Sequence, residues 1–189
     1  MKKLLLIAFV SVLTINTQAQ TKNNAQAFWD NLKALCGKSF EGKMLDSTMV
    51  RDFAGKKLVM HVRACEDGKI RVPFFVGDNK SRTWVFTMST DNRITLKHDH
   101  RHEDGTEEKQ TQYGGTAPNS GFASLQMFPA DVETETVIPS AVTNLWWVTL
   151  TKDKFTYNLR RIGSGRDITV VFDLTKTVET PSAPWGWKD

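Results

Sequence analysis

The sequence lacks the short motifs that identify the common enzyme classes. Its 189 residues include only two cysteines and four histidines, and no histidine follows His102. It contains no Gly-x-Ser-x-Gly elbow, no Cys-x-x-Cys pair and no phosphate-binding glycine loop. These absences exclude the enzymes that depend on such motifs. A Ser-His-Asp triad stays open, because it is defined by spatial arrangement rather than by sequence order.

Basic residues are numerous but are not clustered. The formal net charge is +4, and without Lys2 and Lys3 the chain has 23 basic and 21 acidic residues, a net charge of +2. No basic block of the kind that contacts phosphates is present. The charge pattern therefore predicts no nucleic-acid partner.

Residues 1–19 have the features of a secretory signal peptide. Lys2 and Lys3 precede an uncharged, mainly apolar run from Leu4 to Ile15, and small residues follow at the cleavage position before Gln20. The run is too short to span a bilayer, which requires about 20 apolar residues. We therefore predict an exported protein, periplasmic or secreted. Residues 20–189 would form one soluble domain, with no transmembrane segment after signal removal.

Both cysteines belong to the part of the chain that would be exported. In an oxidising compartment a pair of cysteines is expected to form a disulfide, so the sequence predicts a bond between Cys36 and Cys65. By the loop-entropy model such a bond would stabilise the fold by roughly 3–4 kcal/mol.

One short helix is predicted near the start of this domain. Asn23 or Asn24 can act as its N-cap, apolar residues recur at helical spacing to about Cys36, and Gly37 is a natural stop. Everything after Gly37 indicates strands and turns. The predicted strands cover 39–46, 57–65, 69–76, 82–89, 93–102, 106–113, 123–128, 133–138, 143–151, 154–162 and 166–174.

Short turns between strands of alternating pattern favour consecutive antiparallel hairpins. One sheet closed on itself removes exposed edges, so we predict an all-β fold, a single antiparallel β-barrel after the N-terminal helix. The Pro- and Trp-containing tail from Val178 includes Pro184-Trp185-Gly186-Trp187. We expect this segment to plug one end of the barrel, because exposed tryptophans are costly.

Three of the four histidines occur at every second position. His98, His100 and His102 continue the strand face of Ile94 and Leu96, which usually faces a core or a cavity. Asp104-Gly105 predicts a two-residue hairpin turn.

That turn would pair Arg101 with Glu108 on the outer face. On the inner face it would bring His102 opposite Glu107 and His98 opposite Thr111. The histidines are thus predicted at the polar mouth of the barrel.

Several roles are open to these histidines. Two imidazoles at i and i+2 can chelate one divalent metal ion, so His100, His102 and Glu107 are the candidate metal set. His98, the deepest, is the candidate axial ligand of a haem. The histidines could instead form a polar rim that hydrogen-bonds to acidic residues and water. The candidate residues lining a ligand cavity are His98, His100, Trp84, Phe86, Leu96 and Tyr113, with Trp146 or Trp147 and Tyr157.

The start of the strand region resembles lipocalin-like (calycin) domains. The segment from Leu35 to Gly42 follows a short helix and opens a run of meandering strands, as in those domains. Phe40 stands where they have Trp, three residues after Gly37 instead of two, and Arg160 or Arg161 would be the basic residue that packs against this ring. The resemblance implies a barrel that encloses a small apolar ligand or haem.

The histidine segment also resembles the first motif of cupins. His100-Arg101-His102, Glu107 and Gly114 match its His-x-His, Glu and Gly, while Ile94 occupies the place of the preceding Gly. The second cupin motif is absent. The chain as a whole resembles a class of exported bacterial proteins, which implies no activity.

Together these patterns predict an exported, non-enzymatic binding protein for a small apolar ligand or haem. The alternative is a metal-dependent, cupin-like enzyme that uses His100, His102 and Glu107.

Overall fold

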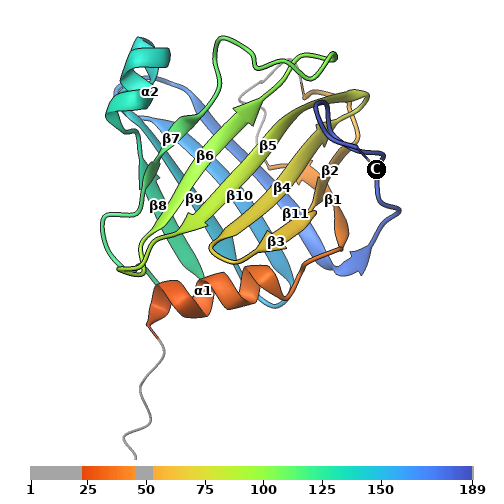
Figure 1. Ribbon diagram of the computed structural model, residues 1–189, viewed down its shortest axis with the longest axis horizontal. Coiled ribbons are helices and arrows are strands. Elements are labelled where there is room, and N and C mark those ends of the chain that lie inside the picture. The colour runs from red at the N-terminus through yellow and green to blue at the C-terminus, as the bar shows by residue number, and fades with distance from the viewer. Residues whose placement is uncertain (1–22, 46–52, 189) are drawn as a thin grey trace, which may run out of the picture.

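The computed structural model of the protein describes residues 23–45 and 53–188 (Figure 1). The predicted signal peptide, 1–19, lies outside these residues. The helices are α1 (Asn24–Lys33), α2 (Val132–Val137) and the 3₁₀ helix η1 (Pro139–Ala141). The strands are β1 (Ser39–Met44), β2 (Leu58–His61), β3 (Ala64–Glu66), β4 (Lys69–Val76), β5 (Asn79–Met88), β6 (Ile94–His100), β7 (Tyr113–Thr116), β8 (Leu125–Pro129), β9 (Asn144–Leu150), β10 (Lys154–Arg161) and β11 (Asp167–Thr177).

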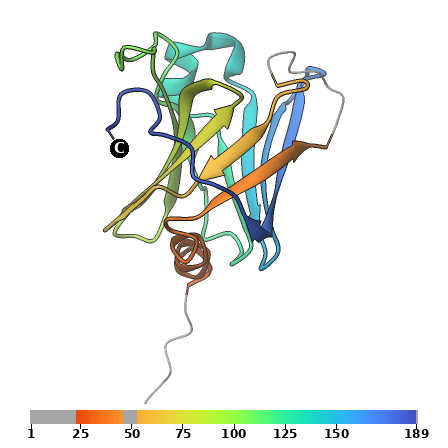
Figure 2. The same ribbon diagram turned by 90° about the vertical axis from the view of Figure 1, so that its right-hand side faces the viewer.

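The strands form one antiparallel sheet in the order β7-β6-β5-β4-β2-β1-β11-β10-β9-β8, with β3 paired to β4 beside β2. The two strands at the ends of this order, β7 and β8, contact each other. The sheet therefore curls into a nearly closed barrel, as Figures 1 and 2 show. The predicted antiparallel β-barrel after an N-terminal helix is confirmed.

The contact between β7 and β8 depends on Gly115. A Cβ atom on Gly115 would lie 1.7 Å from the Pro129 carbonyl oxygen, so only glycine allows this approach. The Gly114 amide donates to Thr134 Oγ1 (2.7 Å), and its carbonyl accepts from the Asp131 amide (3.0 Å). The start of α2 thus holds the two edges together where no regular strand pairing joins them.

The helix α1 covers one end of the barrel (Figures 1 and 2). Asn23 is its N-cap and accepts from the Ala25 amide (2.9 Å), which satisfies one free amide of the first turn. Phe28 and Leu32 are fully buried against the barrel interior. The predicted disulfide is confirmed: Cys36, just after α1, is bonded to Cys65 in β3.

The structure corrects the predicted strand at 133–138. Residues 133–137 belong to α2 and Ile138 is its C-cap before Pro139, although Thr, Val and Ile are residue types that favour strands. The Asp131 carboxylate accepts from the Thr134 amide (2.9 Å), and Glu133 and Glu135 lie in the first helical turn. An acidic N-cap and acidic first-turn residues stabilise a helix N-terminus, and here they outweigh the strand propensity of Thr, Val and Ile.

The C-terminal tail does not plug an end of the barrel as predicted. It runs along the outside, beside β3, β4 and β5 (Figures 1 and 2). The Trp185 amide donates to the Lys80 carbonyl (3.2 Å), and the Arg71 guanidinium lies 5.1 Å from the Trp187 ring centre. The tryptophans are half-buried on the outer face, which lowers their exposure without filling the interior.

Candidate functional site

Strand β6 places two of its histidines in the barrel interior. His98 pairs with Trp84 of β5 on one side and with Tyr113 of β7 on the other, and His100 pairs with Arg82. Directly opposed residues of neighbouring strands share a face. His98 is 3% exposed, whereas His102 lies beyond the strand and is exposed.

The loop after β6 differs from the predicted hairpin. The His102 amide donates to the Thr106 carbonyl (2.8 Å), so three residues and not two make the turn. Gly105 has a φ of +87°, the left-handed conformation that ends this type of three-residue loop. The Asp104 carboxylate accepts from the Thr106 amide (2.9 Å) and stabilises the loop. The register after the turn therefore shifts by one residue.

A shift of one residue turns the following side chains to the opposite face. Arg101 bridges to Glu107 instead of Glu108, and its guanidinium lies 3.2 Å from the Glu107 carboxylate. Glu108 lies on the cavity side, 3.7 Å from His100 Nδ1. Of the predicted strand 106–113, Tyr113 belongs to a regular strand and Glu107 forms an isolated bridge. The pairing is interrupted where the His100 amide donates to Thr111 Oγ1 (2.8 Å) instead of to a backbone carbonyl.

The predicted metal set is not brought together. Glu107 is paired with Arg101 and His102 is exposed on the loop, so neither joins His100 on the cavity wall. Within residues 23–45 and 53–188, no group of three or more His, Cys, Asp and Glu side chains is arranged to hold a metal ion.

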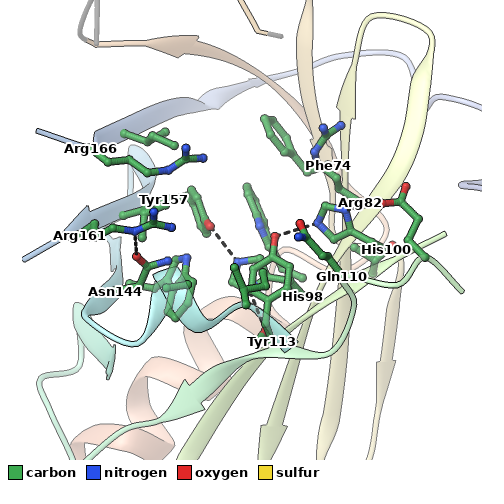
Figure 3. Close-up of a pocket in the computed structure, with 18 of the residues that line it drawn as sticks. Phe74, Arg82, His98, His100, Gln110, Tyr113, Asn144, Tyr157, Arg161 and Arg166 are labelled. Carbon is green, nitrogen blue, oxygen red and sulfur yellow. Dashed lines mark hydrogen bonds and ion pairs between the residues drawn. The ribbon is translucent and has the colours of Figure 1, made fainter. Parts of the chain in front are cut away.

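A cavity of about 470 Å³ opens in the barrel, and Figure 3 shows the residues around it. Its base consists of stacked rings: Trp84 lies 4.9 Å from Phe74 and 4.4 Å from Tyr157, with nearly parallel planes. Trp146 and the stacked pair His98–Tyr113 (4.6 Å) continue this aromatic wall. The cavity thus presents flat apolar surfaces of the kind that bind rings or other planar groups.

His98 is held in one tautomer by two neighbours. Its Nδ1 lies 3.0 Å from the Tyr113 carbonyl oxygen, which can only accept, so Nδ1 carries the proton. Its Nε2 then accepts from the Tyr157 hydroxyl (2.8 Å). Burial lowers the pKa of His98 to about 3 and raises the pKa of Tyr157 well above its usual value. Both groups are therefore neutral at physiological pH.

His100 is also neutral. Burial, followed by the nearby charge of Arg82, lowers its pKa to about 4. The Tyr113 hydroxyl lies 3.0 Å from His100 Nε2, and burial raises the pKa of Tyr113 to about 12. The histidine side of the cavity is thus an uncharged hydrogen-bonding surface rather than a cationic one.

The structure places four of the six predicted ligand-binding residues on the cavity wall: Trp84, His98, His100 and Tyr113. Phe86 and Leu96 are fully buried in the core and do not line it. Of the two candidate tryptophans on β9, Trp146 faces the cavity and Trp147 lies on the outer side. Tyr157 lines the cavity as predicted.

Sequence reasoning did not assign any arginine to this site, and it considered Arg161 only as a partner of Phe40. Arg82, Arg161 and Arg166 line the cavity together with Asn144, whose Oδ1 accepts from Arg161 Nε (2.8 Å; Figure 3). The sequence offered one weak signal, since Arg161 and Arg166 flank the turn Gly163-Ser164-Gly165 and so had to lie at one end of the barrel.

The low pKa of His98 makes folding stability depend on pH. Between pH 6.5 and pH 3 the unfolded chain binds a proton at this residue and the folded chain does not, so the free energy of unfolding falls as the pH decreases. We expect His98 to account for about 2 kcal/mol of the loss between pH 7 and pH 5. Urea unfolding of the wild type and of His98→Gln at both pH values measures this difference.

His102→Gln is the matched control for this prediction, because His102 is exposed and should leave the pH dependence unchanged. Nitrogen NMR should also show the neutral Nδ1–H tautomer of His98 at pH 5. If the wild type and His98→Gln lose equal stability between the two pH values, His98 does not stay neutral in the folded protein.

The chain matches no family model, no curated protein and no solved structure. The resemblances to lipocalin-like and cupin domains therefore have no support beyond the residues that carry them. Arg160 is exposed and Arg161 lies at the cavity, and neither forms a cation–π contact with Phe40 in the described part of the chain. No helix among the described residues is long and apolar enough to cross a bilayer.

Proposed function

We propose that this chain is an exported, non-enzymatic binding protein that holds a small ligand with a planar apolar body in the barrel cavity. The observation that carries the proposal is the cavity of about 470 Å³ with its wall of stacked rings. Its volume lies within the range of roughly 300–1,000 Å³ typical of small-molecule sites. Such sites combine apolar walls with polar groups that orient the ligand, and in this cavity polar groups make up the larger part of the lining.

The depth of the cavity limits the size of this ligand. Trp84 is 2% exposed and packs on Phe155 and Phe172, which are fully buried and do not line the cavity. The core beyond this layer is filled by side chains, including Phe86 and Leu96. A compact ligand with one or two rings fits this site better than a long chain.

The environment of His98 argues against haem as the ligand. Both ring nitrogens of His98 already have partners, the Tyr113 carbonyl and the Tyr157 hydroxyl. Axial ligation through Nε2 would replace the bond to Tyr157 and leave a buried hydroxyl without its partner, which costs about 1–3 kcal/mol. We therefore favour a ligand that packs on the rings. The separation of His102 and Glu107 from the cavity gives no support to the metal-dependent alternative.

Two fluorescent probes that share one ring skeleton test the proposal. N-phenyl-1-naphthylamine is neutral, and 1-anilinonaphthalene-8-sulfonate carries one added sulfonate. We expect at least one of them to bind with a Kd below about 50 µM and to quench tryptophan fluorescence, because Trp84 and Trp146 line the cavity.

Ser140→Trp is the variant that tests the location of the probe. Ser140 is exposed and lines the cavity, so a tryptophan there should fill part of it and weaken binding at least about tenfold. Val142→Trp adds the same side chain at an exposed position that does not line the cavity, and should bind as the wild type does. The proposal is overturned if neither probe binds with a Kd below about 1 mM. It is also overturned if Ser140→Trp and Val142→Trp change the affinity for the probe equally.

A further inference from the structure

Three arginines line the cavity, from two opposite sides of the barrel. Arg82 belongs to β5, Arg161 is the last residue of β10, and Arg166 precedes β11 (Figure 3). Arginine ion pairs in the described part of the chain involve Arg71, Arg93 and Arg101. Within that part, Arg82, Arg161 and Arg166 have no carboxylate within 4.0 Å.

The groups that position two of these arginines are uncharged. Asn144 Oδ1 accepts from Arg161 Nε (2.8 Å), and Asn79 Oδ1 accepts from Arg82 Nη1 (2.9 Å). The Arg82 guanidinium also lies 5.4 Å from the centre of the Phe53 ring. These contacts orient the guanidinium groups of Arg82 and Arg161, and among the described residues none of them neutralises a charge.

The charge of the cavity is positive when all its titratable groups are considered. Glu108 is the one carboxylate among the described lining residues, and its near partner is His100 Nδ1 at 3.7 Å. The two histidines and two tyrosines of the wall are neutral at pH 7. Burial and the charge of Arg166 lower the pKa of Arg161, which shows that these cations repel each other.

A further donor lies deeper in the wall. The indole N–H of Trp146, which is 1% exposed, has no partner in hydrogen-bond geometry among the described residues. It lies near the Tyr157 hydroxyl, where it partly offsets the effect of burial on the tyrosine pKa.

We infer that the ligand is an organic anion: a compact body that packs against the aromatic lining of the cavity, with one carboxylate, sulfonate or phosphate group held by Arg161 and Arg166, across the cavity from Arg82. Guanidinium groups bind such oxyanions through paired N–H donors, and guanidinium groups that have no carboxylate partner among the described residues favour a negative group on the ligand. This inference rests on the proposed function, because it assigns a ligand class to the same cavity.

The two naphthyl probes test the inference directly, since they differ only in the sulfonate. We expect the sulfonate probe to bind at least about tenfold more tightly than the neutral probe, and the difference to shrink as salt is raised. Arg161→Gln and Arg166→Gln should each weaken binding of the sulfonate probe by about three- to tenfold, and weaken the neutral probe much less.

Arg160→Gln is the matched control, because Arg160 adjoins Arg161 but is exposed and does not line the cavity. It should bind both probes as the wild type does. Equal affinity of the wild type for the two probes would overturn the anion assignment and leave the proposed binding function standing. The same holds if Arg161→Gln and Arg166→Gln affect both probes equally. Failure of both probes to bind would instead remove the binding function itself.

Discussion

Replacing Gly115 with alanine is expected to lower the free energy of unfolding by at least about 3 kcal/mol, because the added methyl group has no space at the contact between β7 and β8. A Cβ atom there would lie 1.7 Å from the Pro129 carbonyl oxygen and 2.8 Å from its carbon. These are backbone atoms, so no side-chain rotation relieves the clash. Either β7 moves away from β8 or the backbone of both strands is strained. Urea unfolding followed by circular dichroism measures the loss.

Gly165→Ala is the matched control for Gly115→Ala. A Cβ atom on Gly165 would meet nothing within 4 Å, and its φ is not in the left-handed region. We expect a change in the free energy of unfolding within about 0.5 kcal/mol for this variant. If Gly115→Ala is as stable as Gly165→Ala, then β7 and β8 do not approach as closely as the structure shows, and the barrel is open along this side.

The barrel could be predicted because local patterns and the overall fold agree along most of the chain. Along β5 and β6, the apolar residues Trp84, Phe86, Ile94 and Leu96 are buried at every second position, and Asp91-Asn92 supplies the turn between the strands. The disulfide followed from the number of cysteines alone, since Cys36 and Cys65 had no other candidate partner. In the first case a short segment determines its own structure, and in the second the number of cysteines leaves a single pairing.

The register of the histidine hairpin could not be predicted from the same kind of pattern. Asp104-Gly105 is compatible with a two-residue turn, but Asp104 accepts from Thr106 and only Gly105 takes a positive φ. One extra residue in the loop exchanges the faces of Glu107 and Glu108. A difference of a single position therefore separates a metal set from an ion pair on the outer face, and the local sequence does not distinguish the two.

The arginines of the cavity were missed for a different reason. Arg82 and Arg161 are 79 positions apart, and only closure of the barrel brings β5 and the end of β10 to the same cavity. On the sequence each is an ordinary polar residue near a strand end. Their common feature, the absence of a carboxylate partner among the described residues, is a property of the folded structure alone.

Trp84 is the residue whose truncation should cost most among the cavity-lining side chains. It is 2% exposed and stacks between Phe74 (4.9 Å) and Tyr157 (4.4 Å), with Phe155 and Phe172 below. Large aromatic-to-alanine changes in cores cost about 3–5 kcal/mol, and the lost ring contacts place Trp84→Ala at the upper end of this range. Urea unfolding should show this loss, and near-UV circular dichroism should lose intensity as the stacked rings become disordered.

Trp147→Ala is the control that shows whether the loss of stability depends on the buried position of Trp84 or follows the removal of any tryptophan. Trp147 lies on the outer side of β9 and is only half-buried, next to Trp146 on the inner side. We expect its replacement to cost about 1–2 kcal/mol, since less apolar area leaves contact with the protein. Because Trp84 forms both the base of the cavity and the top of the core, Trp84→Ala should also weaken probe binding, whereas Trp147→Ala should not. If both variants lost equal stability and bound the probes alike, the stacked rings would be neither the support of the core nor the base of the site.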